Sequence, residues 1–309
     1  MITYIKNGTN GLLVSEKWEP NCWIQVENPS ESDKNHLIDE LNIPLSFYND
    51  INDIDERPRF EIEDEWSLII IRVPIKTSEE SLPFSTIPLG IMFKEDVFVS
   101  LSFHSVEMLS DFVKYTQRKL IVKKNNFDLV LRLLLSSSIW FLKYLKQINQ
   151  RIKLAEKQLE KSIQNEDLQT LIQIEKSMVY FTTSLKGNDI LIHKIKNLRW
   201  KKENIDEELL EDVEIELRQA LETTNIYSDI LSGMMDAYAS VISNNLNVIL
   251  KLLTSISILL MIPTLIASFY GMNVPNVFED NHYGFWLVIL ISFLISGIAL
   301  LAFKKKNWI

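Results

Sequence analysis

Residues 252–270 read LLTSISILLMIPTLIASFY, and residues 283–303 read YGFWLVILISFLISGIALLAF. Neither stretch contains a charged side chain, and each is close to the ~20 residues that a helix needs to cross a bilayer. The sequence therefore predicts two membrane-spanning helices, at about 252–270 and 283–303, joined by an external loop over 271–282.

Basic residues beside the two spans predict their orientation. Lys251 precedes the first span and lysines occupy 304–306 after the second, whereas the connecting loop carries the acids Glu279 and Asp280. Because lysines favour the cytoplasmic side of a membrane, we expect both termini in the cytoplasm. Residues 1–10 lack a basic-then-apolar signal, so the part before the spans is expected to stay there. The predicted location is the plasma membrane, with the chain crossing it more than once.

The part before the spans is acidic. Residues 1–250 hold 39 of the 41 acidic and 28 of the 32 basic residues, a net charge of −11. Such a surface argues against nucleic acid as a partner. The acidity fits a domain that attracts cations, and it equally fits simple solubility. Cys22 is the single cysteine, which excludes an internal disulfide and a cysteine-based zinc site, and we expect it to be buried as an apolar residue.

Turn signals and periodicity divide this part into two regions. Residues 1–126 mix short β-rich runs with helical pieces over 31–41 and 106–120, which predicts an α/β domain. The runs 89–93 and 97–101 are expected to form a hairpin. Residues 127–246 lack proline and are predicted to be helical, and residues 247–309 form the membrane region.

The second region is predicted to contain a long buried helix and a long stalk helix. The apolar run Leu129–Leu145 contains Arg132 and Lys143, so it is predicted to be a buried helix and not a third span. A further helix is expected to start near Asn204 and to continue without a stop to Tyr270, as a long helical stalk. The predicted fold class is an α+β membrane protein with a cytoplasmic α/β domain, this stalk and two C-terminal spans.

One face of the first span is polar but uncharged. At helical spacing, this face carries Asn247, Leu250, Thr254, Ser257, Met261, Thr264 and Ser268. Small hydroxyl residues of this kind either serve ordinary helix packing or line a pore with oxygen atoms. A pore requires a symmetric ring of chains, because a single chain with two spans encloses no water-filled path. In such a ring Leu250, Leu253 and Met261 are candidates for a hydrophobic gate that closes by dewetting.

A short motif follows the first span directly. Residues 270–273 read YGMN, residues 238–247 read YASVISNNLN, and residues 57–61 read RPRFE. Together with the two C-terminal spans and the lysines at 304–306, these segments resemble the CorA family of magnesium transporters over most of the chain. The resemblance implies a funnel-shaped homopentamer that transports Mg²⁺, with Co²⁺ and Ni²⁺ as further cargo, and that is gated by intracellular Mg²⁺.

The resemblance also implies roles for individual residues. Gly271, Met272 and Asn273 would form a selectivity loop, in which the Asn273 amide holds hydrated Mg²⁺ through its water shell. The loop acids at 279 and 280 would attract cations or serve only solubility. Asp212 matches a regulatory acid on the stalk, although it also belongs to an acidic face that water alone explains. The family often has a partner acid where this sequence has Lys76, so Lys76 of one subunit could instead reach Asp212 of another.

Other classes of protein remain as alternatives. The chain has no phosphate-binding glycine loop and no nucleophile motif, and its four histidines lie far apart, so no enzyme and no organic cofactor is expected. Mg²⁺ would then be both the transported and the regulatory ion. A transporter of Zn²⁺ or another transition metal from the same family is one alternative. A membrane-anchored coiled-coil scaffold is another.

Overall fold

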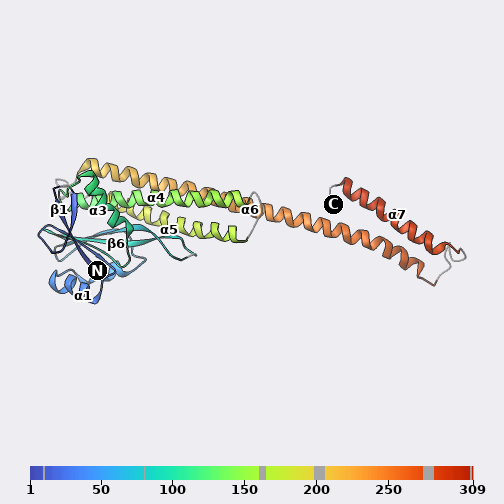
Figure 1. The fold of residues 1–309 in the computed structure, drawn as a ribbon, viewed down its shortest axis with the longest axis horizontal. Coiled ribbons are helices and arrows are strands. Elements are labelled where there is room, and N and C mark those ends of the chain that lie inside the picture. Colours follow the sequence, from blue (N-terminus) through green and yellow to red (C-terminus); the bar gives the residue numbers. More distant parts are fainter. Residues whose placement is uncertain are drawn as a thin grey trace. The chain divides into compact units, whose positions relative to one another are not determined.

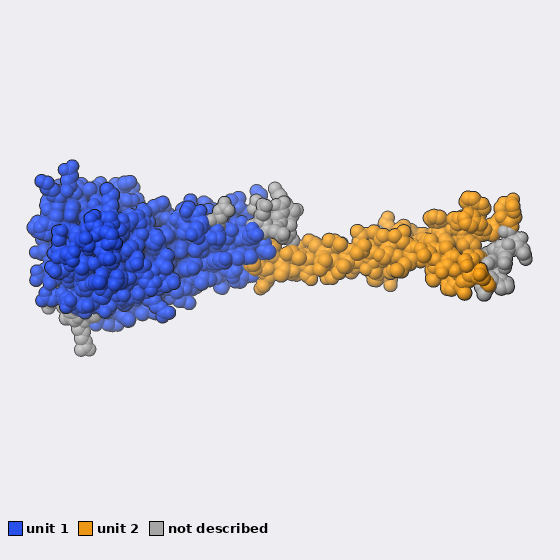
Figure 2. All heavy atoms as spheres, turned by 90° about the horizontal axis from the view of Figure 1, so that it is seen from below, with its two compact units in different colours: residues 1–233 blue, residues 234–309 orange. Residues whose placement is uncertain are grey.

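The computed structural model describes residues 1–9, 11–79, 81–159, 165–197, 206–273, 282–306 and 308. The chain divides into two compact units, Met1–Gly233 and Met234–Ile309 (Figure 2).

A mixed β-sheet forms the centre of the first unit. Within the described chain its order is β2-β1-β3-β7-β6-β5-β4. Strands β3 and β7 pair in parallel, and the other neighbours pair antiparallel. The strand bounds are β1 Ile2–Gly8, β2 Gly11–Ser15, β3 Trp23–Glu27, β4 Arg59–Glu63, β5 Trp66–Lys76, β6 Phe84–Lys94 and β7 Val97–Ser102.

The central strands β5, β6 and β7 are buried along most of their length because helices cover both faces of the sheet (Figure 1). Successive side chains of a strand point to opposite faces. Met92 accordingly joins the core that Leu37 of η1 (His36–Glu40) and Phe47 of α2 (Leu45–Asn52) also enter, whereas the preceding helix α1 (Glu31–Asn35) buries no residue. The next residue, Phe93, contacts Phe127 of α4 on the other face, with 5.3 Å between ring centroids. The result is a helix–sheet–helix sandwich.

The second helical layer consists of α3 (Glu107–Lys119), α4 (Asn126–Leu159) and α5 (Asn165–Lys196). Phe84 of β6 lies between the last two of these helices, with ring centroids 5.2 Å from Tyr144 and 6.4 Å from Phe181. Such aromatic contacts add to the burial of apolar area in holding helices on a sheet.

Most of the predicted elements of this unit are confirmed. The expected hairpin is β6–β7, closed at the pair Lys94 and Val97. The apolar run Leu129–Leu145 lies within α4 and contributes to the core, as predicted. The helix expected over 31–41 is regular only in α1 and widens to a π-helix in η1, which directs Leu37 into the core. The Cys22 side chain is buried, as expected, and burial raises the pKa of its thiol.

A buried cation lies where β5 passes the loop before β4. The Arg72 guanidinium donates hydrogen bonds to the carbonyl oxygens of Ile54, Glu56 and Thr86, and also to the Thr86 hydroxyl at 3.0 Å. Burial lowers the pKa of Arg72. Carbonyl oxygens thus satisfy a charge that would otherwise be costly to remove from water.

The second unit contains the C-terminal part of helix α6 and the whole of helix α7. Helix α6 extends over Glu207–Tyr270 as one element, and α7 covers Gly284–Lys305. Both contain a stretch that is long and apolar enough to cross a membrane. The predicted continuation of the stalk helix to Tyr270 is confirmed, whereas its predicted start at Asn204 lies outside the described residues.

Candidate functional site on helices α6 and α7

The predicted polar stripe lies along an exposed face of α6. Within one chain all of its members are exposed: Asn247, Leu250, Thr254, Ser257, Met261, Thr264 and Ser268. Buried or partly buried residues occupy a different side of the same helix, namely Ser255, Leu259, Ile262, Pro263, Ile266 and Tyr270. At about 100° per residue, the centres of these two sets lie on roughly opposite sides of the helix. The stripe is therefore free to meet water or another chain.

Two hydroxyls of the stripe bond to their own helix. The Ser257 hydroxyl donates to the Leu253 carbonyl at 2.9 Å, and the Thr264 hydroxyl donates to the Leu260 carbonyl at 3.0 Å. A hydroxyl that has used its proton in this way still has lone pairs on its oxygen. These oxygens can accept hydrogen bonds from water, including the water shell of a cation.

Apolar side chains interrupt the stripe. Met261 is 67% exposed. Leu250 and Leu253 are also exposed, and they lie about one turn apart, closer to the start of the apolar segment. An exposed apolar side chain between hydroxyl groups has no packing role within the single chain. Their assignment as a hydrophobic gate stays a prediction.

The predicted selectivity loop begins where α6 ends. The Gly271 N–H donates to the Ala267 carbonyl at 2.9 Å, and the Met272 N–H donates to the Phe269 carbonyl at 3.4 Å. Gly271 and Met272 thus complete the last helical turn, and Asn273 follows with an exposed side chain. The external acids Glu279 and Asp280 lie outside the described residues.

A side chain at position 271 would not be crowded by the described residues of the chain. The nearest atom to a Cβ built on Gly271 is the Ala267 carbonyl oxygen at 3.4 Å, an ordinary contact. Among the described residues, therefore, nothing next to Gly271 requires a glycine at this position.

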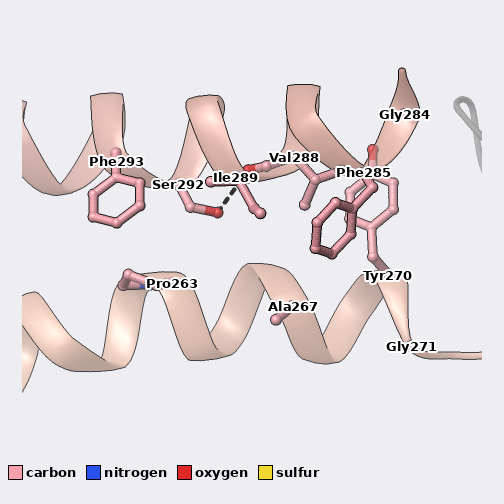
Figure 3. A pocket seen from close by; sticks show the side chains of 10 residues that line it. All are labelled: Pro263, Ala267, Tyr270, Gly271, Gly284, Phe285, Val288, Ile289, Ser292 and Phe293. Carbon is pink, nitrogen blue, oxygen red and sulfur yellow. Dashed lines mark hydrogen bonds between the residues drawn. The ribbon is translucent and has the colours of Figure 1, made fainter. Parts of the chain in front are cut away.

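An apolar cleft separates α6 from α7 near the same end of α6 (Figure 3). Its volume is about 500 Å³, and it is lined by Pro263, Ala267, Tyr270, Gly271, Gly284, Phe285, Val288, Ile289, Ser292 and Phe293. The Ser292 hydroxyl donates to the Val288 carbonyl at 2.8 Å. The only side-chain hydroxyl that α7 contributes to this lining therefore already has a partner, and the cleft suits an apolar occupant.

The cleft residues were not singled out from the sequence as a group. Their signal is a spacing of small residues, with Pro263, Ala267 and Gly271 four positions apart on α6. Small residues at this spacing let membrane helices approach closely.

Asp212, the predicted regulatory acid, is exposed on α6 in the first unit. Other acids nearby have partners: Glu214 accepts from the Lys196 ammonium at 2.9 Å, and Asp206 accepts from Lys124 at 2.9 Å. The hydrogen bond from Lys124 lowers the pKa of Asp206. Within the described ranges Asp212 forms no ion pair, with Lys76 or otherwise, so its regulatory role stays a prediction.

The surroundings of Lys76 are basic. Lys76 and Arg151 line a hollow of about 390 Å³ together with Glu79 and several neutral polar residues. No group of three or more His, Cys, Asp or Glu residues that could hold a metal occurs in the described part of the chain. The described residues of one chain therefore do not form a metal-binding sensor site by themselves.

The fold and the polar stripe define a class of protein, one with an α/β unit followed by two apolar helices. Comparison with known proteins supports this class. Residues 18–305 match the family described as CorA-like Mg2+ transporter protein. Because this match covers nearly the whole chain, the protein belongs to that family, and it is a membrane protein.

Individual relatives agree with this assignment. The cobalt/magnesium transport protein CorA of Methanocaldococcus jannaschii is 25% identical, with 100% of both chains covered. The protein of the same name from Thermotoga maritima is 24% identical over 93% of this chain and 83% of its own. The solved structure of the CorA magnesium transporter from M. jannaschii superposes with a TM-score of 0.86 at 24% identity, covering 100% of this chain and 99% of that one. The last comparison shows a shared fold.

Proposed function

We propose that this protein is a membrane channel for divalent cations that admits Mg²⁺ to the cytoplasm, with Co²⁺ and Ni²⁺ as further cargo. The observation that carries the proposal is the exposed, uncharged polar stripe of α6, which leads to Gly271, Met272 and Asn273 at the end of that helix. The family match and the names of the two relatives, both called cobalt/magnesium transport proteins, support the choice of Mg²⁺ and Co²⁺.

Neutral oxygens suit this cargo. Mg²⁺ gives up its inner water shell reluctantly, so a pathway that binds the hydrated ion must contact its waters and not the metal. The Asn273 amide and the backbone of the loop offer acceptors for those waters, and the hydroxyl oxygens of Ser257 and Thr264 continue them along the helix. Binding of this kind is weak enough for the ion to leave, which conduction requires.

The pathway needs several copies of the chain. One pair of apolar helices cannot enclose water, so α6 of each copy would face a common axis, and we assign five copies from the family resemblance. The cell membrane would hold α6 and α7, with Glu279 and Asp280 outside. The lysines at 304–306 would keep the C-terminus in the cytoplasm. Because the chain would cross the membrane twice, the N-terminal unit would lie on the same side.

Regulation would act on the first unit. Asp212 is exposed and without an ion pair in the described chain, so it is available to a Mg²⁺ ion or to a neighbouring subunit. A bound divalent ion would offset repulsion between the acidic stalk helices of adjacent copies and hold the ring closed. The chain would act without an organic cofactor and without catalysing a chemical reaction.

The experiment that tests this function is ion uptake into liposomes that contain the purified protein. Uptake of Mg²⁺, Co²⁺, Ni²⁺ and Zn²⁺ is measured separately, each with and without a pH gradient. We expect Mg²⁺ uptake in the absence of a gradient. Uptake of Zn²⁺ alone would favour a zinc transporter, and absence of all four fluxes from correctly assembled protein would favour a membrane-anchored scaffold.

A further inference from the structure

Four exposed lysines lie at one level of the α6–α7 pair. Figure 3 shows that the two helices run antiparallel, with Gly271 and Gly284 at the same end. Lys251 lies 20 residues before Gly271 on α6, and Lys304 lies 20 residues after Gly284 on α7. Because both helices rise by about 1.5 Å per residue, these two lysines are level with each other. The basic cluster at this level consists of Lys251, Lys304, Lys305 and Lys306.

The basic cluster has no acidic counter-charge close to it in the second unit. The sequence of this unit contains three acids, Asp236, Glu279 and Asp280. Asp236 precedes Lys251 by 15 residues of continuous helix, which is about 22 Å. The other two acids follow the end of α6, and that end lies about 28 Å from Lys251. Both distances exceed the ~8 Å screening length, so the four charges receive no anion from their own unit.

The chain folds back on itself directly after the basic cluster. The Trp308 N–H donates to the Phe303 carbonyl at 3.0 Å, and the indole lies parallel to the Phe303 ring with 5.7 Å between ring centroids. Phe303 is the last residue of the uncharged stretch. Because an indole has an apolar body and a polar N–H, it favours the boundary between hydrocarbon and headgroups. The aromatic pair therefore places the lysines at 304–306 at this boundary.

Aromatic side chains also mark the other boundary of the same helix. Tyr283 and Trp286, at the start of α7, are both exposed. Tyr283 and Phe303 are 20 residues apart, which is about 30 Å along a helix and equals the thickness of the hydrocarbon core. The basic cluster thus lies just outside the hydrocarbon, at the depth of the phospholipid phosphates.

Anionic headgroups supply the charge that the basic cluster lacks. A lysine ammonium offers three donors to phosphate oxygens, and each lysine beside an anionic leaflet strengthens the attraction by about fivefold. A zwitterionic headgroup carries a cation of its own and so offers no net charge. We propose that the basic cluster is a binding surface for anionic phospholipid, with the lysines on its phosphate and with Phe303 and Trp308 against its acyl chains.

The aromatic pair is the reason to assign a lipid and not a soluble anion. A free phosphate ion would gain from the four lysines but would make no favourable contact with the Phe303 and Trp308 rings, which lie beside them. The proposal goes beyond ion transport, because it requires only that α6 and α7 span a membrane.

Spin-labelled lipids test the proposal. The purified full chain is reconstituted in phosphatidylcholine that contains a trace of spin-labelled phosphatidylglycerol or of spin-labelled phosphatidylcholine. Electron paramagnetic resonance separates lipid in contact with the protein from bulk lipid, and so gives the ratio of the two association constants. We expect a ratio of about fivefold in favour of phosphatidylglycerol, which falls between about 0.1 M and about 1 M NaCl. Equal association of the two lipids with the unmodified protein would overturn the proposal.

Substitutions locate the binding surface. Lys→Gln at all four positions of the basic cluster should bring the ratio close to one, whereas Lys→Arg at the same positions should preserve it, because the charge is kept. The double variant Lys304→Gln with Lys306→Gln retains two cations for membrane insertion and should lower the ratio in part. A preference that survives both glutamine variants would show that the lipid binds elsewhere.

A control variant removes the same charge from the other unit. It carries glutamine in place of four exposed lysines of the first unit and should keep the full preference for phosphatidylglycerol. A loss in this variant equal to that in the cluster variant would show that only net charge matters, and would refute the binding surface. The control positions are Lys17, Lys114, Lys146 and Lys153.

Inorganic phosphate separates a lipid surface from a site for a free anion. Sodium phosphate and sodium chloride at equal ionic strength should lower the ratio equally, because both act only by screening. Loss of the preference in phosphate but not in chloride would show that the basic cluster binds free phosphate, and would overturn the assignment to phospholipid.

Discussion

Asn188 of α5 takes the place of a neighbouring strand at Arg72 of β5. Its side-chain amide donates to the Arg72 carbonyl at 2.8 Å, and its amide oxygen accepts from the Arg72 N–H at 2.9 Å. Strand β4 begins at Arg59, which pairs with Ile70, so Arg72 lies beyond the edge strand. Buried backbone groups must find partners, and one asparagine here satisfies both.

Replacing Asn188 should therefore destabilise the first unit. Asn188→Leu keeps the size of the side chain but leaves the Arg72 N–H without a partner and its carbonyl with only the Ser137 hydroxyl at 3.3 Å. We expect a loss of about 2 kcal/mol, measured as a lower unfolding midpoint of the detergent-solubilised chain by tryptophan fluorescence. Thr183→Val on the same helix removes an exposed hydroxyl and should change stability by less than about 0.5 kcal/mol. Equal stability of Asn188→Leu and the unmodified chain would refute this role.

The buried amine of Lys123 should make the folding stability of the first unit depend on pH. Its nitrogen is buried, has no hydrogen-bond partner in the described chain, and lies 5.2 Å from the centre of the Phe98 ring. Burial lowers the pKa of Lys123. Between this lowered value and the ~10.4 of an unfolded lysine, the unfolded state binds more protons, so stability rises with pH in that interval.

Lys123→Met should consequently stabilise the protein at neutral pH, by about 1 kcal/mol, and the gain should shrink as the pH approaches 10. Thermal unfolding at a series of pH values measures both effects. Lys124→Met is the matched control, because the Lys124 amine pairs with Asp206 at the surface and its removal should not stabilise. A gain that stays constant up to pH 10 would show that the charge of Lys123 is not responsible.

The sequence predicted those parts of the fold that depend on local pattern. The two spans follow from residues 252–270 and 283–303, which lack charge over the width of a bilayer. The β6–β7 hairpin follows from apolar runs separated by three charged residues at 94–96. The sequence could not supply the Asn188–Arg72 contact, because the two residues are 116 positions apart and nothing local marks an asparagine in a helix as the partner of a strand.

The sequence predicted the polar stripe along α6, but it did not predict the cleft between α6 and α7. The stripe on α6 needs only helical periodicity, and the structure places all of its members on the exposed side. The cleft depends on how α7 lies against α6, which no single-helix pattern determines. Gly271 shows the same limit, because the described residues around it do not reveal why the predicted selectivity loop has glycine there.

A polar side chain in the proposed gate should raise the leak of ions. Met261→Ser places a hydroxyl where an exposed apolar side chain interrupts the stripe, so water would remain in the constriction and no longer block ions. We expect faster Mg²⁺ entry into liposomes that contain high internal Mg²⁺, and the same for Leu253→Ser. Leu294→Ser on α7 is the control and should not change the leak. If cysteines at 253 and 261 react only with lipid-soluble reagents, the stripe does not face water.

Regulation by Mg²⁺ should depend on Asp212. Repulsion between acids matters only within the ~8 Å screening length at physiological salt, so an exposed acid close to a subunit boundary is the group that a divalent ion would affect. Millimolar Mg²⁺ should protect the stalk of the unmodified chain from protease, and less so in Asp212→Ala. Asp212→Lys should lower uptake even at low internal Mg²⁺, because a fixed positive charge imitates the bound ion.

A matched variant checks that the effect belongs to this acid. Glu214→Gln alters a neighbouring acid that already pairs with Lys196, and it should leave Mg²⁺ protection largely intact. If millimolar Mg²⁺ changes neither the protease protection nor the flux of the unmodified protein, the acids of α6 serve only to solvate that face.

The measurement that tests the central claim most directly is Mg²⁺ uptake by Asn273→Ala in liposomes, at a protein content equal to that of the unmodified chain. The Asn273 side chain is exposed after the last turn of α6, so its removal should leave assembly on native mass spectrometry unchanged. The account predicts that uptake falls to the level of protein-free liposomes, because the amide that holds the water shell of the ion is gone. Undiminished uptake by Asn273→Ala would contradict it.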